Sequence, residues 1–260
     1  MRRCHNRPVR PTLIALALAL ALAVAGPAAT ASDLRPQPAA PFFSNGFEQG
    51  LRGFNLAGVG DVDPTVTAVN ASSGGHAARF ELRGDQERSE LIVGGNGGRS
   101  ANSTIEFHEG DEAWLGFSFN VRQMVWGRVG VHNLIMQLKS EGTGSPEFAL
   151  QLSDVRGERG FWSSGGASIV DRFLAPIKPR RWYRALLHFR ASNRGNGFFH
   201  LYLDGRLIDE RSQVSLIEPG ERTAYLKLGL YRSGERLPGK SVVLVDAVKL
   251  GRAQGAVQRG

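Results

Sequence analysis

The chain has 260 residues, 42% of them hydrophobic, with a formal charge of +8 and a single cysteine, Cys4. The length suffices for one large domain, and one cysteine excludes an internal disulfide framework. The sequence has no basic run with interleaved aromatic residues, no phosphate loop, no nucleophile elbow and no Cys/His metal cluster, so we expect no nucleic acid partner and none of those chemistries.

The first 31 residues have the pattern of a secretory signal peptide. Four arginines precede an apolar run from Leu13 to Ala25, and the small residues Ala29-Thr30-Ala31 follow it as a cleavage signal. We therefore expect a secreted or periplasmic protein with no membrane partner; a retained N-terminal anchor is the alternative. Cleavage would remove Cys4 and lower the charge to +4, because this segment holds four arginines and no acidic residue. The remaining basic residues are mostly arginines, which suit an anionic partner.

Residues 32–41 are rich in proline and alanine and are predicted to be a disordered leader. Residues 42–251 are predicted to form one β domain, followed by a flexible tail at 252–260. Short strand-like segments recur between Gly, Asn, Asp and Ser clusters, and Leu203-Asp204-Gly205-Arg206 has the pattern of a two-residue hairpin. This spacing predicts an all-β fold, either a sandwich or a jelly roll. An aromatic strand with an Asn-Gly turn is predicted over 42–48. The further predicted strands are 77–82, 88–93, 103–107, 112–121, 132–140, 147–154, 181–191, 198–203, 206–209, 225–232 and 241–250.

In the segment 225–232, the alternation of apolar and polar side chains is the most informative in the sequence. Its three leucines point to one face, and Tyr225, Lys227, Gly229 and Tyr231 point to the other. Two phenols, an ammonium and a gap left by glycine predict the floor of a ligand groove. Half-exposed tyrosines of an ordinary strand are the alternative.

Two further strands carry aromatic and polar residues on their second face. Trp114 and Asn120 share a face of 112–121, and Arg184 and His188 share a face of 181–191. Such residues suit a sugar, because rings stack on indole and phenol while hydroxyls need planar donors and acceptors. A solvated outer sheet is the alternative.

Short polar pairs also recur at strand spacing. Asn133 is predicted to lie on the same face as Gln137 and Lys139, with Leu134, Met136 and Leu138 on the core side. Any one pair would be read as a structural bridge, but convergence of all of them indicates a binding site. The pairs are Arg88/Glu90, Gln137/Lys139 and Lys227/Tyr231.

These motifs resemble a known family. Arg88-Ser89-Glu90-Leu91, Gln137-Leu138-Lys139 and the run from Tyr225 to Tyr231 are similar to the three motifs of jelly-roll alginate lyases. The layout from Phe42 to Leu250 resembles the heparin-lyase-I-like and glucuronan-lyase-like group of β-jelly-roll polysaccharide lyases. The resemblance implies a concanavalin-like β-jelly roll, a sandwich of two antiparallel sheets. It also implies β-elimination on an anionic polysaccharide that contains uronic acid, with no cofactor.

The resemblance also implies roles for individual residues. Arg88 and Gln137 would neutralise the uronate carboxylate, and Tyr231 would transfer the proton, as acid and also as base if nearby cations lower its pKa. Glu90 would orient Arg88 or Lys227.

One residue departs from the alginate lyase pattern. Lys139 stands where those enzymes have a histidine, so either Tyr231 is both base and acid or one of His132, His188 and His200 takes part. The departure puts alginate in doubt as the substrate. A histidine on a strand is more often a structural residue that is satisfied by hydrogen bonds.

The sequence thus gives one set of candidate site residues and three functional classes. The catalytic candidates are Arg88, Gln137, Lys139 and Tyr231. The candidates for binding substrate are Glu90, Trp114, Asn133, Tyr225, Lys227, Arg232, His188 and Arg184. A structural calcium ion on Asp61, Asp63 or Asp154 is left open, solvated turns being the alternative. We expect a monomeric lyase; a non-catalytic lectin-like domain and a glycoside hydrolase are the rival classes.

Overall fold

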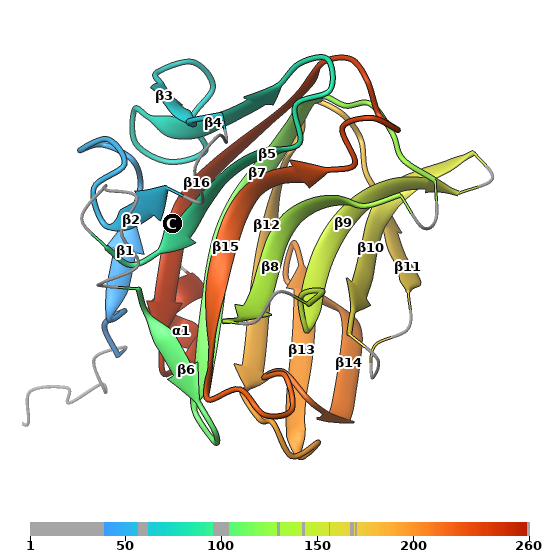
Figure 1. Ribbon diagram of the computed structural model, residues 1–260. Helices are drawn as coiled ribbons and strands as arrows, with labels where there is room; N and C mark the ends of the chain where they lie inside the picture. Colours follow the sequence, from blue (N-terminus) through green and yellow to red (C-terminus); the bar gives the residue numbers. More distant parts are fainter. Residues whose placement is uncertain are drawn as a thin grey trace, which may run out of the picture. The chain divides into compact units, whose positions relative to one another are not determined.

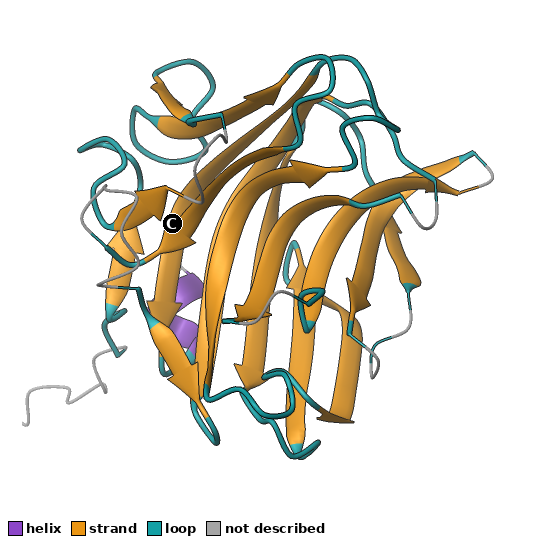
Figure 2. Cartoon of the chain, in the orientation of Figure 1, coloured by secondary structure: helices purple, strands orange, loops and turns teal. Residues whose placement is uncertain are grey.

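The computed structural model describes residues 39–56, 62–95, 104–128, 131–141, 144–155, 157–166, 169 and 171–258. Residues 1–38, with the expected signal peptide and most of the expected leader, lie outside the described residues. The described chain is almost entirely β, with two eight-stranded sheets and one short helix. Every pairing of two named strands is antiparallel, so the predicted β-jelly roll is confirmed (Figure 2).

The two sheets are each built from strands that are distant in the sequence (Figure 1). The first sheet has the order β14 (Arg206–Val214), β13 (Gly197–Leu203), β12 (Trp182–Arg190), β7 (Glu112–Gln123), β16 (Ser241–Gly251), β4 (Ala77–Leu82) and β3 (Thr65–Thr67), with β1 (Phe43–Asn45) paired to β16. The second sheet has the order β11 (Arg172–Pro176), β10 (Glu158–Gly165), β9 (Phe148–Val155), β8 (Asn133–Ser140), β15 (Thr223–Arg232), β5 (Arg88–Val93) and β2 (Phe54–Leu56), with β6 (Glu106–His108) paired to β15.

The core fills the space between the sheets with the inward residues of both. Phe119 of β7 stacks on Phe161 of β10 at 5.3 Å between ring centroids, and Phe148 of β9 meets Phe199 of β13 at 4.4 Å. All four rings are fully buried. Burial of a side chain of this size stabilises the fold by about 2 kcal/mol, so these inter-sheet contacts hold the second sheet in place.

The hairpin at Asp204-Gly205 is confirmed, because both residues have positive φ, 50° and 80°, and join β13 to β14. Four strands were not predicted: β2, β3, β10 and β11. The residues expected as a flexible tail include helix α1 (Gln254–Gln258), whose Ala256 and Val257 are buried against Leu186 of β12. No helix among the described residues is long and apolar enough to cross a membrane.

A β-bulge changes the predicted faces of β8. Its register shifts against β15 and β9 at Ile135, where β15 contributes one extra residue between Leu228 and Tyr231. Ile135 therefore packs in the core, and Leu134 lines the opposite surface, the reverse of the simple alternation. Gly229 lies in this irregular stretch with φ of 146°, and a Cβ there would come within 2.3 Å of the Ser89 carbonyl oxygen. Only glycine fits this position.

Candidate active site

A cationic groove of about 780 Å³ lies on the face of the second sheet that is turned away from the core. Strands β5, β8 and β15 form its floor, and residues 144–146 form one side. The side chains that line it are Arg88, His132, Leu134, Gln137, Lys139, Ser145, Pro146, Tyr225, Lys227 and Tyr231, together with Gly144. Three of these residues are cations, and none of the described residues that line the groove is acidic, so the groove suits an anion.

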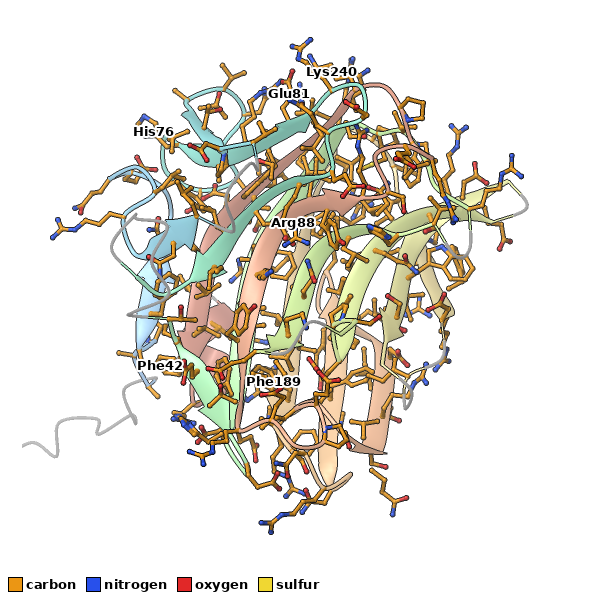
Figure 3. All side chains as sticks on the ribbon, in the orientation of Figure 1. Phe42, His76, Glu81, Arg88, Phe189 and Lys240 are labelled. Carbon is orange, nitrogen blue, oxygen red and sulfur yellow. The ribbon has the colours of Figure 1, made fainter. Side chains whose placement is uncertain are left out.

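Strand register explains why three distant motifs meet here. On β15, Tyr231 is the partner of Arg88 on β5, and Lys227 is the partner of Gln137 on β8. Neighbouring strands lie about 4.8 Å apart, which brings these side chains within reach of one small ligand. Figure 3 shows Arg88 on the open side of the second sheet, whereas Phe189 belongs to the core.

Glu90 joins two of the candidate residues beneath the groove. Its carboxylate accepts a hydrogen bond from Nε2 of Gln137 and lies 3.5 Å from Nε of Arg88. The Glu90 side chain is only 1% exposed, whereas Arg88 is 28% exposed. Glu90 thus holds both groups from beneath the groove, the guanidinium through an ion pair and the amide through a hydrogen bond.

Tyr231 lies between a cation and an imidazole. The guanidinium carbon of Arg88 is 4.1 Å from the centroid of its ring, a cation–π contact. The ring of His132 is 4.5 Å from the same ring, measured between centroids. These two contacts hold the phenol in a defined orientation at the edge of the groove.

His132 is the histidine that the structure brings to this site. Its Nδ1 lies 3.0 Å from Oγ of Ser233, which fixes the ring. Burial lowers the pKa of His132; Glu87 opposes this shift, and Arg88 adds to it. The lowered pKa favours a neutral imidazole beside Tyr231 at neutral pH. His188 and His200, the other two candidates, lie on the first sheet.

Tyr225, Lys227 and Lys139 complete the floor. Lys227 is buried but lines the groove, and its Nζ is 5.7 Å from the centroid of the Tyr225 ring. Burial raises the pKa of Tyr225, and the nearby Glu90 raises it further, so this phenol keeps its proton. Tyr225 can therefore donate a hydrogen bond or stack on a sugar, but it is unsuited to act as a base.

Three predicted binding residues are not at the groove, and their placement is corrected. Trp114, Arg184 and His188 lie on β7 and β12 of the first sheet, on the face that α1 partly covers. Trp114 stacks on His188 at 4.1 Å, and Arg184 donates hydrogen bonds to the carbonyl oxygens of Ala247 and Val257. Burial lowers the pKa of Arg184 to about 10. Trp114 and Arg184 thus contact the chain's own C-terminal segment, and His188 stacks on Trp114.

Asn133 and Arg232 are also outside the groove, although they belong to strands that form it. Both are fully buried. The amide of Asn133 donates to the carbonyl oxygen of Val125, 3.1 Å away, because the bulge reverses the face of β8 at this point. Arg232 donates to the carbonyl oxygens of Gln86, Gly84 and Gly239, so it ties together the loops at one end of β15. Both residues have structural positions.

The sequence did not identify several residues that line the groove: Leu134, Gly144, Ser145 and Pro146. Leu134 was assigned to the core because alternation gives no sign of a bulge. The other three belong to a loop between β8 and β9, for which periodicity carries no signal.

The described residues contain no group of three or more His, Cys, Asp or Glu side chains placed to hold a metal ion. Of the three aspartates considered for calcium, Asp61 lies outside the described residues. Asp154 accepts a hydrogen bond from the backbone of Gly157 and pairs with Nε of Arg159 at 3.0 Å. Asp154 is therefore a hydrogen-bonded residue of a turn.

Comparison with known proteins identifies the family. Residues 46–249 match the polysaccharide lyase family, and the chain belongs to it. A search of curated sequences gave no match. The chain is a polysaccharide lyase with a jelly-roll fold.

Solved structures share this fold at low sequence identity. An endo-β-1,4-glucuronan lyase from the fungus Trichoderma reesei has a TM-score of 0.63 and 18% identity, over 84% of this chain and 98% of that one. The cellulose induced protein Cip1 has a TM-score of 0.54 and 10% identity, over 81% and 97% of the two chains. A marine alginate lyase from Zobellia galactanivorans has a TM-score of 0.50 and 13% identity, over 69% and 78%.

Proposed function

We propose that the protein cleaves a uronate-containing anionic polysaccharide by β-elimination in the cationic groove. In this reaction the proton on C5 of the uronate leaves, the bond from C4 to the glycosidic oxygen breaks, and a double bond forms between C4 and C5. The protein must therefore stabilise charge on the carboxylate and move a proton. The groove holds groups suited to both tasks.

Arg88 and Gln137 neutralise the carboxylate. Loss of the C5 proton pushes negative charge onto the carboxylate, and donors held in advance stabilise that charge without reorganising. Both side chains are held by Glu90, so their geometry is set before substrate binds. Removal of one donor of this kind costs about 3 kcal/mol of barrier. Glu90 is thus a positioning residue, while Lys139 and Lys227 add positive charge.

Tyr231 transfers the proton to the leaving glycosidic oxygen. Its phenolic hydroxyl lines the groove and can donate a proton, so it can act as a general acid. Arg88, 4.1 Å from the ring, favours the phenolate after this transfer. The C5 proton is accepted either by Tyr231 as a phenolate, which then returns that proton to the leaving oxygen, or by the neutral imidazole of His132, whose ring contacts Tyr231.

The observation that carries the proposal is that Arg88, Gln137 and Tyr231 line one open groove. The test is to incubate purified protein with alginate, glucuronan, heparin and hyaluronan while recording the ultraviolet absorbance of the unsaturated product. A rise with at least one of these polymers supports the proposal. Cleavage of a glycan without this absorbance, as a hydrolase would give, would refute it. Binding without cleavage would favour the lectin-like alternative for the groove.

We further propose a secreted or periplasmic location. The N-terminal pattern of arginines, apolar run and small residues supports this location. Mass spectrometry of the exported protein is the test, and a chain that begins near residue 32 is the expected result.

A further inference from the structure

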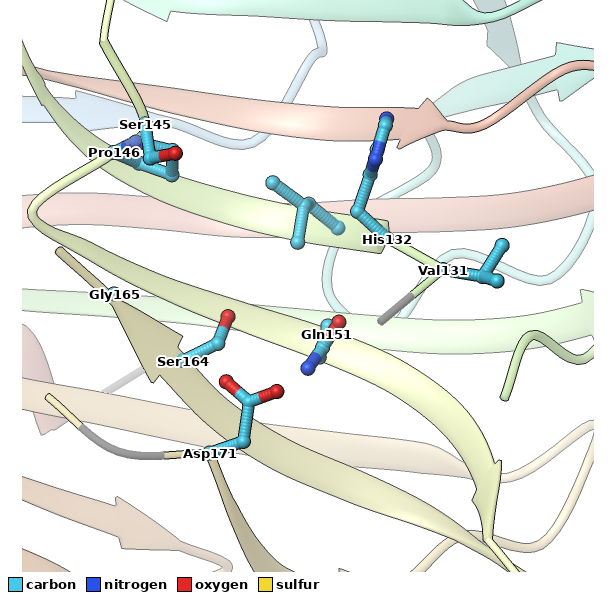
Figure 4. Close-up of a pocket in the computed structure, with 9 residues that line it drawn as sticks. Val131, His132, Ser145, Pro146, Gln151, Ser164, Gly165 and Asp171 are labelled. Carbon is cyan, nitrogen blue, oxygen red and sulfur yellow. The ribbon is translucent and has the colours of Figure 1, made fainter. Parts of the chain in front are cut away.

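A second cavity, of about 190 Å³, opens directly beside the cationic groove. The two share His132, Leu134, Ser145 and Pro146 as lining residues. This side cavity extends over β8, β9 and β10 (Figure 4), and neither Arg88 nor Tyr231 is among its lining residues. Two strand spacings, about 10 Å, lie between β8 and β10, enough to hold the sugar next to the one in the groove.

The side cavity is lined by hydrogen-bonding groups. Figure 4 shows Gln151 of β9, Ser164 of β10 and Asp171 facing one space. Gln151 is only 6% exposed, and no hydrogen bond joins its amide to another side chain among the described residues. Buried amides nearly always have a hydrogen-bond partner. Gln151 thus presents its amide to the cavity, where it can hydrogen-bond to a ligand.

The charge of this surface changes sign at the side cavity. Asp171 is exposed at the side cavity and has no ion-pair partner among the described residues. The next cavity along, which shares Ser145 and Gly165 with the side cavity, contains Glu147 and Glu218. The described residues that line these two cavities include no lysine or arginine. A carboxylate bound there would therefore meet only like charge, whereas sugar hydroxyls would find acceptors and an amide.

We propose that the side cavity is a subsite for an uncharged sugar and that Asp171 selects against a second uronate at that position. The substrate is then a heteropolysaccharide in which uronates alternate with neutral sugars, and a polymer made only of uronate is a poor substrate. This inference rests on the proposed function, because the uronate in the cationic groove sets the position of its neighbour.

The test removes the charge of Asp171 and keeps its shape. For Asp171→Asn we expect kcat/KM on glucuronan, in which every sugar is a uronate, to rise about threefold to tenfold. On hyaluronan, in which uronate alternates with an uncharged sugar, kcat/KM should change less than about twofold. The control is Glu210→Gln, an exposed carboxylate on β14 of the first sheet, which should alter neither value. Equal values for wild type and Asp171→Asn on glucuronan would overturn the inference and leave the lyase function standing.

A binding measurement separates the inference from the proposed function. Oligosaccharides of both polymers are titrated against Tyr231→Phe with and without Asp171→Asn, so no turnover is needed. We expect Asp171→Asn to tighten binding of the all-uronate oligosaccharide and not of the alternating one. If no polymer is cleaved, the proposed function fails and this titration alone decides the inference. Failure of the variant to bind either oligosaccharide, or equal tightening of both, would overturn it.

Discussion

Arg88 lies against the phenol ring of Tyr231, its guanidinium carbon 4.1 Å from the ring centroid. The two residues are cross-strand partners on β5 and β15, 143 positions apart in the sequence numbering of the chain. The contact joins the group proposed to hold the substrate carboxylate to the group proposed to transfer the proton. Both functions therefore depend on the same pair of strands.

Tyr231→Phe should abolish turnover and leave the fold intact. The substitution removes only the hydroxyl and keeps the ring that contacts Arg88 and His132. Loss of general acid–base catalysis lowers rates by about a hundredfold to ten-thousandfold. The measurement is kcat from product absorbance, with circular dichroism to check folding. Tyr225→Phe is the matched control, since Tyr225 lines the same groove and should retain most activity. Unchanged turnover in Tyr231→Phe would remove Tyr231 from the mechanism.

Gln137→Ala should lower kcat by about a hundredfold, because one preorganised donor to the carboxylate is lost. The substitution also leaves Glu90 with one partner fewer, so the free energy of unfolding should fall by about 2 kcal/mol. Steady-state kinetics and denaturant unfolding measure the two effects. Gln123→Ala, at the exposed end of β7 on the other sheet, is the control and should change neither. A loss of stability with kcat intact would make Gln137 purely structural.

His132 should make folding stability depend on pH. Burial lowers its pKa in the folded protein below the reference value of 6.5, so the unfolded chain binds a proton more readily. The stability associated with neutral His132 is thus complete above pH 6.5 and declines as the pH falls below it. The measurement compares the unfolding midpoint of wild type and His132→Gln across this range. Wild type should lose more stability on acidification than the variant, and parallel curves would contradict the shift.

Arg184→Ala should lower the folding stability of the protein without affecting substrate binding. The side chain donates to the carbonyl oxygens of Ala247 and Val257, and so links α1 to the first sheet. Loss of these charge-assisted hydrogen bonds should lower the free energy of unfolding by about 3 kcal/mol. Arg206→Ala, an exposed arginine on β14, is the control. A raised KM for Arg184→Ala with unchanged stability would return Arg184 to the list of binding residues.

Where the strands are regular, the alternation of side chains predicted which residues face the groove. Tyr225, Lys227 and Tyr231 share one face of β15 as expected, and Arg88 and Glu90 share one face of β5. These residues meet because a period of two fixes the face, and the motif order resembles that of a family with known strand pairing. Whether each residue takes part in catalysis stays a prediction.

The alternation of polar and apolar side chains does not show which of the two sheets a polar face belongs to. Trp114 and His188 have the composition of a sugar-binding face, yet they lie on the first sheet beside α1. The helix was unexpected because five residues are too few to show a helical period. Asn133 was misplaced for a different reason: one bulge exchanges the two faces of β8, and no residue type marks it.

The side cavity was missed because two of its strands were not recognised as a pair. β10 carries glycines, serines and aromatics without strict alternation, Ser164 lies near its end, and Asp171 directly precedes β11. Gln151 lies in a strand that was predicted, but only the neighbouring strand shows that its amide faces a cavity.

The most direct test of the account uses a uronate polymer that the protein cleaves. This polymer is compared with the same polymer after chemical reduction of its carboxylates to alcohols. The initial rate of product absorbance is measured for both, along with the formation of new chain ends. The account predicts rapid β-elimination of the native polymer and no cleavage of the reduced one, because Arg88 and Gln137 then have no carboxylate to neutralise. Equal cleavage of the reduced polymer would contradict it.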